Sequence, residues 1–475
     1  MSAEQSWNLE ASELARVTGG QLLSSVASTF SRVGTDTRQD LKGRLFVPLK
    51  GANFEGHDFV AQAVDKGASA VLFSQWREEW RPLLGRASFV QVSDTLAALQ
   101  SLARHWRRIH NFKVIGITGS NGKTSTKEFT SALLKPHLRM HSAKGSYNNH
   151  WGVPLTILEA GPDITHLILE MGMNHAGEIW RLCQVAEPDV VVVTTVGRAH
   201  IGQLGSIEAI AQAKEEIYTA APKALHVFNV DNEWTMRMQA RSRAQQLTFS
   251  AFKSAADVHL RAQRFTWEGL ELVGHLKGQS GQAKVKVFGR HNTVNLMAAS
   301  TLALAAGLTP EQIWQGLARI QDVAWGRNQL LLLENGAHIL FDGYNANPDS
   351  MIALIKNLYE MEGVNRKFLI VGDMLEQGEF TDKVHEEIGE QAAAVAGLNG
   401  IWYVGQNFKA FQRGLEKNDF KLDFVHTPVV DPGVARQVHS WLRPGDLVAI
   451  KASRGLALEK VFEHWPLKTP LCKKP

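Results

Sequence analysis

The chain has 475 residues, of which 44% are hydrophobic and 21% are charged, and this balance excludes wholesale disorder, collagen and coiled coil. Its 51 Lys and Arg residues against 47 Asp and Glu residues leave a net charge of +4, too weak a bias to predict binding to nucleic acid or to an anionic membrane. At roughly 150 residues per domain, the length predicts about three domains.

The two cysteines, Cys183 and Cys472, are far apart in the sequence. This excludes a disulfide framework and a thiolate zinc site, and it fits a reducing compartment. The N-terminus has no apolar signal core, and the longest apolar run, Val190–Val196, is shorter than the roughly 20 residues of a membrane helix. We therefore expect a cytosolic protein without membrane insertion.

The first part of the chain, to about Arg108, mixes short apolar runs with helical patterns. Strands are predicted at Leu45–Leu49 and Ala70–Phe73, and helices at Ala61–Lys66 and Thr95–Arg108. A longer alternation follows from Phe112 to about Ala324, with strands at Lys113–Thr118, His166–Glu170, Asp189–Thr195 and Leu225–Asn229 and helices at Ser125–Leu134 and Ser206–Ala220. Such alternation predicts a parallel sheet covered by helices.

A third part begins near Trp325 and repeats the alternation. Strands are predicted at His338–Asp342, Phe368–Gly372, Ile401–Val404 and Leu447–Lys451, and helices at Asp349–Tyr359, Thr381–Ala396 and Leu456–His464. Linkers are expected at His105–Lys113 and Gln321–Arg327. We therefore predict an α/β protein with domains over residues 1–110, 111–325 and 326–475.

The segment Lys113–Phe129, KVIGITGSNGKTSTKEF, has the features of a phosphate-binding loop. A buried strand ends at Thr118, two glycines bring backbone N–H groups close to phosphate oxygens, and a helix N-terminus follows. Lys123 can neutralise phosphate charge and the Thr124 hydroxyl can ligate Mg²⁺. The full GxxxxGK[ST] pattern is not met, because Ile117 stands at its first glycine. Since strand, glycines, lysine, threonine and helix coincide, nucleotide binding is favoured over a simple glycine turn.

Three further residues are candidates for metal or phosphate chemistry. Glu170 ends a predicted strand, and open α/β sheets bind ligands at the carboxyl ends of their strands. His200 follows the next strand in a glycine-bounded loop, although a lone loop histidine is usually neither a ligand nor a catalyst. Lys214, within AKEE, has by itself the pattern of a solvated helix face.

Taken together, the segments resemble those of the Mur ligases, the ATP-dependent amide-bond ligases of peptidoglycan precursor synthesis. The resemblance covers essentially the whole chain and rests on TGSNGKT, SYNNHWGVPLTIL, EMGMNHAGEI, AHIGQLGS, the Lys214 helix, FGRHNTVNLMAA and DGYNANPDS, in this order. It implies a UDP-sugar-binding N-terminal domain, a central parallel-sheet ATPase domain and a C-terminal Rossmann-like domain. DGYNANPDS and Val371–Gly389 are most typical of the member that adds D-alanyl-D-alanine to UDP-N-acetylmuramoyl-tripeptide.

The resemblance also implies roles for individual residues. ATP would be bound by Gly119, Ser120, Asn121, Gly122, Lys123, Thr124, Ser125, Asn292, Asn295, Arg327, Asp342 and Asn345. Mg²⁺ would be bound by Thr124, Glu170, His200 and a carbamylated Lys214, and catalysis would depend on Lys123, His200, Lys214 and Arg327. The substrates would contact Thr35, Asp36, Arg38, Phe46, His57, Asn149, Lys451 and Ser453. We expect a bacterial, cytoplasmic monomer that uses ATP and Mg²⁺.

The sequence departs from the family pattern at three points: Gly343 and Ala452 replace an acidic residue and a glycine, and Trp151 stands where a small aliphatic residue is usual. Three alternatives remain open. The ligase adding the third amino acid normally carries a DNPR motif that this chain lacks, a folate-polyglutamate ligase lacks the N-terminal TDTR pattern, and a nucleotide-regulated binding protein needs none of the metal candidates. No signature separates a tripeptide ending in diaminopimelate from one ending in lysine.

Overall fold

The computed structural model describes residues 9–26, 29–51, 54–143, 145–321, 324–418 and 423–469, so Cys472 and the middle of the expected linker Gln321–Arg327 lie outside the described residues. The chain forms two compact units. The first comprises Met1–Gly116, Leu138–Gly172 and Glu178–Asp189, and the second comprises Ile117–His137, Met173–Gly177 and Val190–Pro475. The predicted α/β class is confirmed in both units.

The first unit begins with a five-stranded sheet in the order β1-β5-β4-β3-β2, parallel except for β1. Aromatic and aliphatic side chains of β3–β5, α2 and the following turn, including Phe46, Phe73 and Trp80, form its core. The elements are α1 (Ala11–Thr18), β1 (Gln21–Ser24), β2 (Val33–Gly34), β3 (Leu45–Phe46), α2 (Val60–Asp65), β4 (Ala70–Phe73), β5 (Ser88–Gln91) and α3 (Thr95–Ile109). The expected strand Leu45–Leu49 is therefore shorter than predicted.

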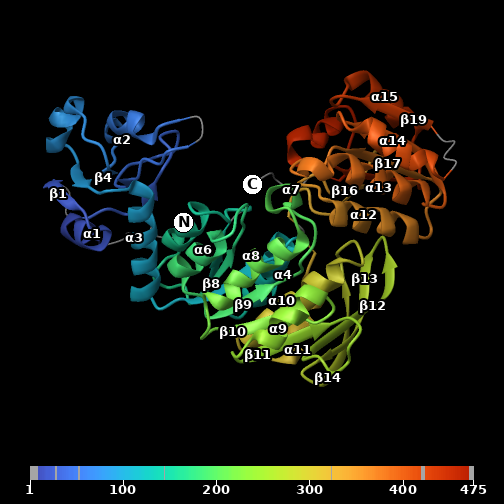
Figure 1. Ribbon diagram of the computed structural model, residues 1–475, viewed down its shortest axis with the longest axis horizontal. Coiled ribbons are helices and arrows are strands. Elements are labelled where there is room, and N and C mark those ends of the chain that lie inside the picture. Colours follow the sequence, from blue (N-terminus) through green and yellow to red (C-terminus); the bar gives the residue numbers. More distant parts are fainter. Residues whose placement is uncertain are drawn as a thin grey trace. The chain divides into compact units, whose positions relative to one another are not determined.

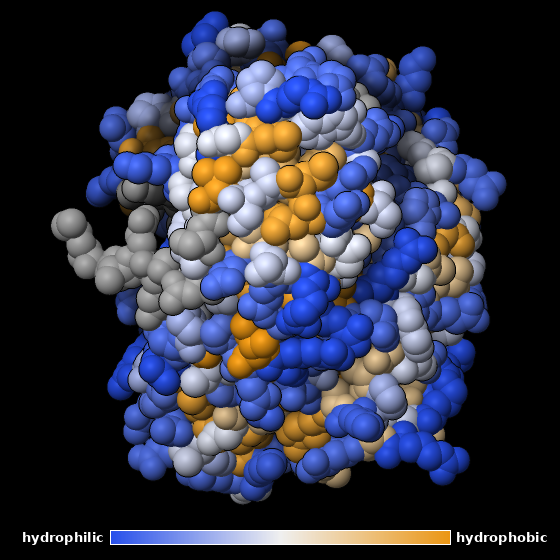
Figure 2. Space-filling view, turned by 90° about the vertical axis from the view of Figure 1, so that its left-hand side faces the viewer, coloured by the Kyte–Doolittle hydropathy of each residue, from blue (hydrophilic) through white to orange (hydrophobic). Residues whose placement is uncertain are grey.

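The rest of the first unit packs on α3, which contacts α1, α5 and α6. Strands β7 and β8 pair in parallel, and β6 leads from the first unit into the second. The elements are β6 (Lys113–Thr118), β7 (Met140–Ser142), α5 (Gly152–Glu159), β8 (His166–Glu170) and α6 (Glu178–Ala186). On the face shown in Figure 2, hydrophilic side chains surround small groups of hydrophobic ones.

The second unit starts with α4 (Lys123–Leu134), which packs against α10. Strands β9 to β12 pair in parallel, and β12 to β14 form an antiparallel extension that the sequence did not predict. The elements are β9 (Val190–Val193), α7 (Ile201–Leu204), α8 (Ile207–Thr219), β10 (Leu225–Asn229), α9 (Glu233–Arg241), β11 (Gln246–Ser250), β12 (Val258–Thr266), β13 (Gly269–Leu276), β14 (Gln279–Val285), α10 (Asn292–Ala305) and α11 (Pro310–Arg319).

The C-terminal part of this unit is a six-stranded sheet in the order β15-β16-β20-β17-β18-β19, parallel except for β15 and flanked by helices (Figure 1). Its β17 is buried on both faces: Phe368 and Ile370 join a core with Val438 of α15, while Leu369 and Val371 are buried on the other face. The elements are β15 (Gln329–Leu332), β16 (His338–Phe341), α12 (Pro348–Glu360), β17 (Lys367–Gly372), α13 (Thr381–Ala393), β18 (Leu398–Val404), α14 (Phe408–Glu416), β19 (Asp423–Thr427), α15 (Pro432–Trp441) and β20 (Leu447–Lys451).

The expected helix Leu456–His464 is wrong in type. Two 3₁₀ helices, η4 (Arg454–Leu456) and η5 (Leu458–Glu463), stand in its place. They are separated by Ala457, whose φ of 49° is left-handed and interrupts any continuous α-helix. No helix among the described ranges is long and apolar enough to cross a membrane.

Candidate functional site

The loop between β6 and α4 is held in a conformation that requires its glycines. Gly119 has φ 150°, and a Cβ there would lie 1.9 Å from Thr194 Oγ1. Gly122 has φ 83°, and a Cβ there would lie 2.1 Å from Asn295 Oδ1. No side chain caps α4, whose N-cap is Gly122, so the loop offers backbone N–H groups and a helix N-terminus to an anion.

Lys123 opens α4 and folds back over this loop, since its Nζ donates a hydrogen bond to the carbonyl of Gly119 at 2.8 Å. Thr124 follows it and is buried, with 6% of its surface exposed. A lysine and a hydroxyl directly behind the glycine loop are the groups that bind phosphate charge and a hydrated cation. The geometry therefore favours a polyphosphate ligand.

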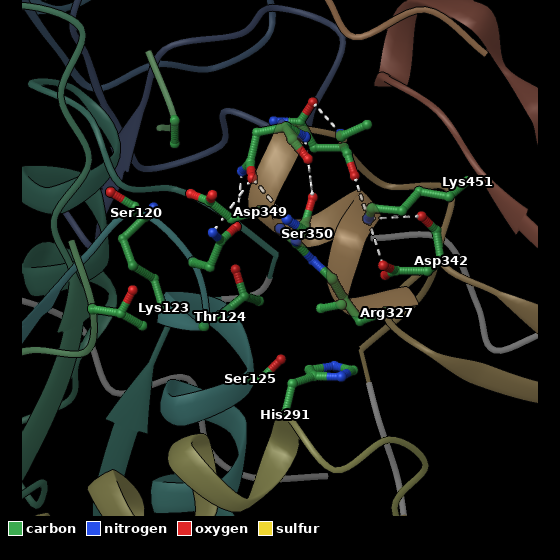
Figure 3. A pocket seen from close by; sticks show the side chains of 18 of the residues that line it. Ser120, Lys123, Thr124, Ser125, His291, Arg327, Asp342, Asp349, Ser350 and Lys451 are labelled. Atoms are coloured by element: carbon green, nitrogen blue, oxygen red, sulfur yellow. Dashed lines mark hydrogen bonds and ion pairs between the residues drawn. The ribbon is translucent and has the colours of Figure 1, made fainter. Parts of the chain in front are cut away.

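The loop forms one wall of a cavity of about 270 Å³, whose other walls come from the loop after β9, the start of α10 and the C-terminal part of the unit (Figure 3). Twelve of the predicted residues line it: Ser120, Asn121, Gly122, Lys123, Thr124, Ser125, His200, Asn295, Arg327, Asp342, Asn345 and Lys451. Four predicted residues of the same unit, Gly119, Lys214, Asn292 and Ser453, are not among its lining residues. Two of these form hydrogen bonds with residues that line the cavity. Asn292 Oδ1 accepts from Asn295, and Ser453 Oγ accepts from the backbone N–H of Leu375.

On the C-terminal wall, Lys451 and Asp342 form a buried ion pair. Lys451 Nζ donates to Asp342 Oδ2 at 2.5 Å and to the carbonyl of Asn345 at 2.8 Å. Burial lowers the pKa of Lys451, while the neighbouring Asp342 opposes this and Arg327 adds to it. The resemblance assigns Asp342 to nucleotide binding. In the structure its carboxylate pairs with Lys451, so these two residues together add no net charge to this wall of the cavity.

Arg327 contributes an unsatisfied donor to the same wall. Its guanidinium lies 4.2 Å from the centre of the Tyr344 ring, and its buried Nε has no hydrogen-bond partner. An unpaired buried guanidinium N–H is costly, so its presence in a cavity is best explained by an anionic ligand that accepts from it. This orphaned donor is the observation that most directly fits a phosphate group.

His200 occupies the loop before α7 in a left-handed conformation with φ 65°. Its Nδ1 lies 3.2 Å from Glu376 Oε2, and this contact lowers the pKa of Glu376 more than burial raises it. Glu376, which the sequence did not single out, also lines the cavity.

The environment of Lys214 differs from the one expected from the sequence. The solvated helix face expected from its glutamate neighbours is wrong, because its side chain is 1% exposed. Burial, with Lys123 as a second cause, lowers the pKa of Lys214 well below its usual value. A lowered pKa makes the neutral amine, which is the nucleophilic form of lysine, easier to reach.

His291 also lines the cavity, although the sequence analysis did not identify it as a site residue. Asn357 Nδ2 donates to its Nδ1 at 2.9 Å, and burial lowers the pKa of His291 to about 4. On the other side of the ring, Asn328 Nδ2 lies 3.0 Å from Nε2, so amide groups of two asparagines hold the imidazole in place. The pattern HN before a helix was the only signal for this residue.

The first unit contains the other predicted residues. Thr35, Asp36, Arg38 and Phe46 line a cavity of about 450 Å³ together with Phe54, Phe59 and Trp151. His57 is not part of it: the ring lines a neighbouring cavity of about 250 Å³, 2.7 Å from Glu55 Oε1, and accepts from the backbone N–H of Ser74. Asn149 Oδ1 accepts from the backbone of Gly152.

Glu170 lies at the end of β8 in the first unit and is 2% exposed. Asn148 Nδ2 donates to its Oε1 at 2.8 Å. Asn148 belongs to the NNHWG segment, so that segment orients the carboxylate. Among the described residues, no group of three or more His, Cys, Asp or Glu side chains is arranged to hold a metal ion.

Comparison with known proteins shows that three family models match successive parts of this chain. Residues 117–303 match the Mur ligase middle domain, residues 326–454 the Mur ligase glutamate ligase domain, and residues 29–107 the catalytic domain of the Mur ligase family.

Two relatives are named UDP-N-acetylmuramoyl-tripeptide–D-alanyl-D-alanine ligase. The Bacillus subtilis protein is 36% identical over 92% of this chain and 93% of its own, and the Escherichia coli protein is 34% identical over 84% and 86%. Among solved structures, MurF from Acinetobacter baumannii has a TM-score of 0.87 at 27% identity, covering 97% of this chain and 99% of its own. MurF ligase from Thermotoga maritima in complex with ADP has a TM-score of 0.78 at 28% identity, covering 91% and 96%.

Proposed function

The chain belongs to the Mur ligase family of ATP-dependent ligases, and from this membership we propose that it joins D-alanyl-D-alanine to UDP-N-acetylmuramoyl-tripeptide. The product would be the UDP-sugar pentapeptide precursor of peptidoglycan. The observation that carries the proposal is the cavity in which Lys123, Arg327 and the glycine loop meet, since it fits the triphosphate that such a ligation consumes.

We propose that domains over residues 1–110, 111–325 and 326–475 bind the UDP-sugar, ATP and the incoming dipeptide, respectively. The aromatic cavity around Phe46 and Trp151 favours the first assignment, because aromatic walls suit a planar base. We further propose a monomer of the bacterial cytoplasm, where ATP and UDP-linked sugars are available.

Amide formation from a carboxylate and an amine needs an activated acyl group. The peptide carboxylate would attack the γ-phosphorus of ATP, forming an acyl–phosphate bond as the bond to ADP breaks. Lys123 and Arg327 would lower the repulsion between the two anions and hold the phosphoryl group in line. The neutral amine of the dipeptide would then attack the acyl carbon, expel phosphate and lose a proton.

The residues present also fit Mg²⁺. Thr124 follows the phosphate loop lysine, Glu170 is a buried carboxylate, and Lys214, whose pKa is lowered by burial, can in its neutral form add CO₂ to give a carbamate and a proton. Thr124, His200 and the carbamate, all in the second unit, would hold the ion together with phosphate oxygens, because the protein donors alone are few. When bound, Mg²⁺ would neutralise charge between the phosphates and the attacking carboxylate.

The experiment that tests this function is release of ADP and phosphate by the purified chain with ATP, Mg²⁺ and both substrates. Release should require D-alanyl-D-alanine and the tripeptide together, with tripeptides ending in diaminopimelate and in lysine compared side by side. Turnover with a UDP-dipeptide and a single amino acid would instead identify the ligase for the third residue. Turnover with folate and glutamate would identify a folate ligase.

A further inference from the structure

Arg198, in the loop between β9 and α7, bridges two carboxylates from the C-terminal part of the second unit. Its backbone N–H and Nε donate to Asp349 at 2.6 and 3.0 Å, and its Nη1 and Nη2 donate to Glu387 at 2.6 and 3.2 Å. The Arg198 side chain is 22% exposed and both carboxylates are 34% exposed. A fork that engages two carboxylates at once holds them in a fixed geometry.

The same loop is tied to the phosphate loop. Ser120 Oγ donates to the carbonyl of Gly197 at 3.0 Å and accepts from its N–H at 2.9 Å. On the other side, Asn121 and Asn347 exchange amide hydrogen bonds of 2.8 and 3.4 Å. Asn347 is the N-cap of α12, and Asp349 lies in its first turn, so one helix end meets both loops.

The segment Gly197–Gly202 also lies very close to the C-terminal part of the same unit. A Cβ at Gly197 would lie 2.2 Å from Asp349 Oδ2, and a Cβ at Gly202 would lie 2.5 Å from the backbone of Gln377 and Gly378. Glycine is therefore needed at position 202, where the close atoms are backbone, and a side chain at position 197 would displace the Asp349 carboxylate. Asp349 and Ser120 both line the cavity (Figure 3), whereas Glu387 does not line it.

We infer that Arg198 is a positioning residue of the nucleotide site: it fixes α12 and α13 against the two loops and so sets the distance between the phosphate loop and Arg327. It also neutralises Asp349, whose carboxylate would otherwise face the phosphates. Burial opposes the charge of Arg198, but Glu387 and Asp349 raise its pKa above the usual value, so it stays charged. The inference rests on the proposed function only for the identity of the ligand, ATP.

The test is the affinity of a non-hydrolysable ATP analogue with Mg²⁺, measured by calorimetry on the full chain without peptide substrates. Arg198→Gln should raise the Kd at least about tenfold, because only the fraction of molecules with the bridge formed binds the analogue well. Glu387→Gln should raise it in the same direction while leaving the cavity wall intact. The double variant should be no weaker than Arg198→Gln alone, since both changes remove one bridge.

Arg237→Gln is the matched control, because it breaks an exposed ion pair with Glu233 and should leave the Kd unchanged. Arg198→Lys should recover part of the affinity lost in Arg198→Gln, and circular dichroism should show the native fold in each variant. A Kd within about twofold of wild type in both single variants, or an additive loss in the double variant, overturns the inference. Because no ligation is needed, a wild-type chain that binds the analogue but joins no peptides would refute the proposed function alone.

Discussion

Lys451 and Asp342 form an ion pair whose side chains are only 2% and 10% exposed, at 2.5 Å, on the wall of the nucleotide cavity. Three segments depend on this pair, because Lys451 also donates to the carbonyl of Asn345, and Asp342 accepts from the backbone of Asn328. The pair therefore joins the end of β20 to the end of β16, at the sheet edge where open α/β folds bind ligands.

Removing one member of this pair should lower the free energy of unfolding more than removing both. Lys451→Met leaves the Asp342 carboxylate buried without a counter-charge and should lower the free energy of unfolding by about 3 kcal/mol. The double variant Lys451→Met with Asp342→Asn should be more stable than Lys451→Met, measured by urea unfolding. A double variant less stable than Lys451→Met would contradict the ion pair.

A matched control for this pair exists in the same sheet. Asp446 is fully buried and paired with Arg366 at 2.6 Å, outside the cavity. Asp446→Asn should lower stability without a specific effect on the affinity for an ATP analogue.

Lys123→Ala should abolish turnover while the fold is retained. The lysine amine donates to the carbonyl of Gly119 in the glycine loop, and removal of such a preorganised charge typically costs a factor of about a thousand in kcat. Lys135→Ala, at the exposed end of the same helix, is the control and should keep the wild-type rate. Wild-type phosphate release by Lys123→Ala would remove the assignment of the phosphate loop.

Activity should depend on CO₂ through Lys214. We expect removal of CO₂ and bicarbonate to reduce the rate of phosphate release, and added bicarbonate to restore it, because a buried neutral amine can form a carbamate. Lys214→Ala should be inactive and partly rescued by acetate or formate. Lys223→Ala, on the exposed turn that follows the helix, should respond to neither treatment. An active, CO₂-independent Lys214→Ala would contradict the carbamate.

His291 should make the protein less stable in mild acid. Its pKa is about 4 in the fold against 6.5 when free, so between these values the unfolded chain binds a proton that the native protein does not. Stability should therefore fall as pH drops from 6.5 to 4, by about 3 kcal/mol from this group. The free energy of unfolding, measured by denaturation across this pH range, should fall by that amount more in wild type than in His291→Asn. Parallel pH dependences would show that His291 titrates normally.

Ten of the twenty strands in the described residues could be predicted, because their patterns are local. The predicted bounds of β4, β6, β8, β10 and β20 match the structure, since each is a continuous buried run. The phosphate loop was found for the same reason, as its glycines and Lys123 are adjacent in the sequence.

Features set by packing could not be predicted. Lys214 has acidic neighbours that are typical of a surface, yet Ile210, Ala211 and Ile217 share its buried face, and only the assembled unit shows this. Arg198 and Glu387 are 189 residues apart, so no local pattern links them. The antiparallel extension did leave a signal: polar and apolar residues alternate in β12, and Lys277 and Gly278, with φ 45° and 81°, form the two-residue turn between β13 and β14.

The walls of the nucleotide cavity come from residues as far apart as Ser120 and Lys451. A ribosome makes the glycine loop before the wall that contains Lys451. A nascent chain therefore lacks a complete pocket until β20 has emerged, and cannot consume ATP before then. Binding of ATP to the complete pocket would therefore require that both of its walls had folded and come together.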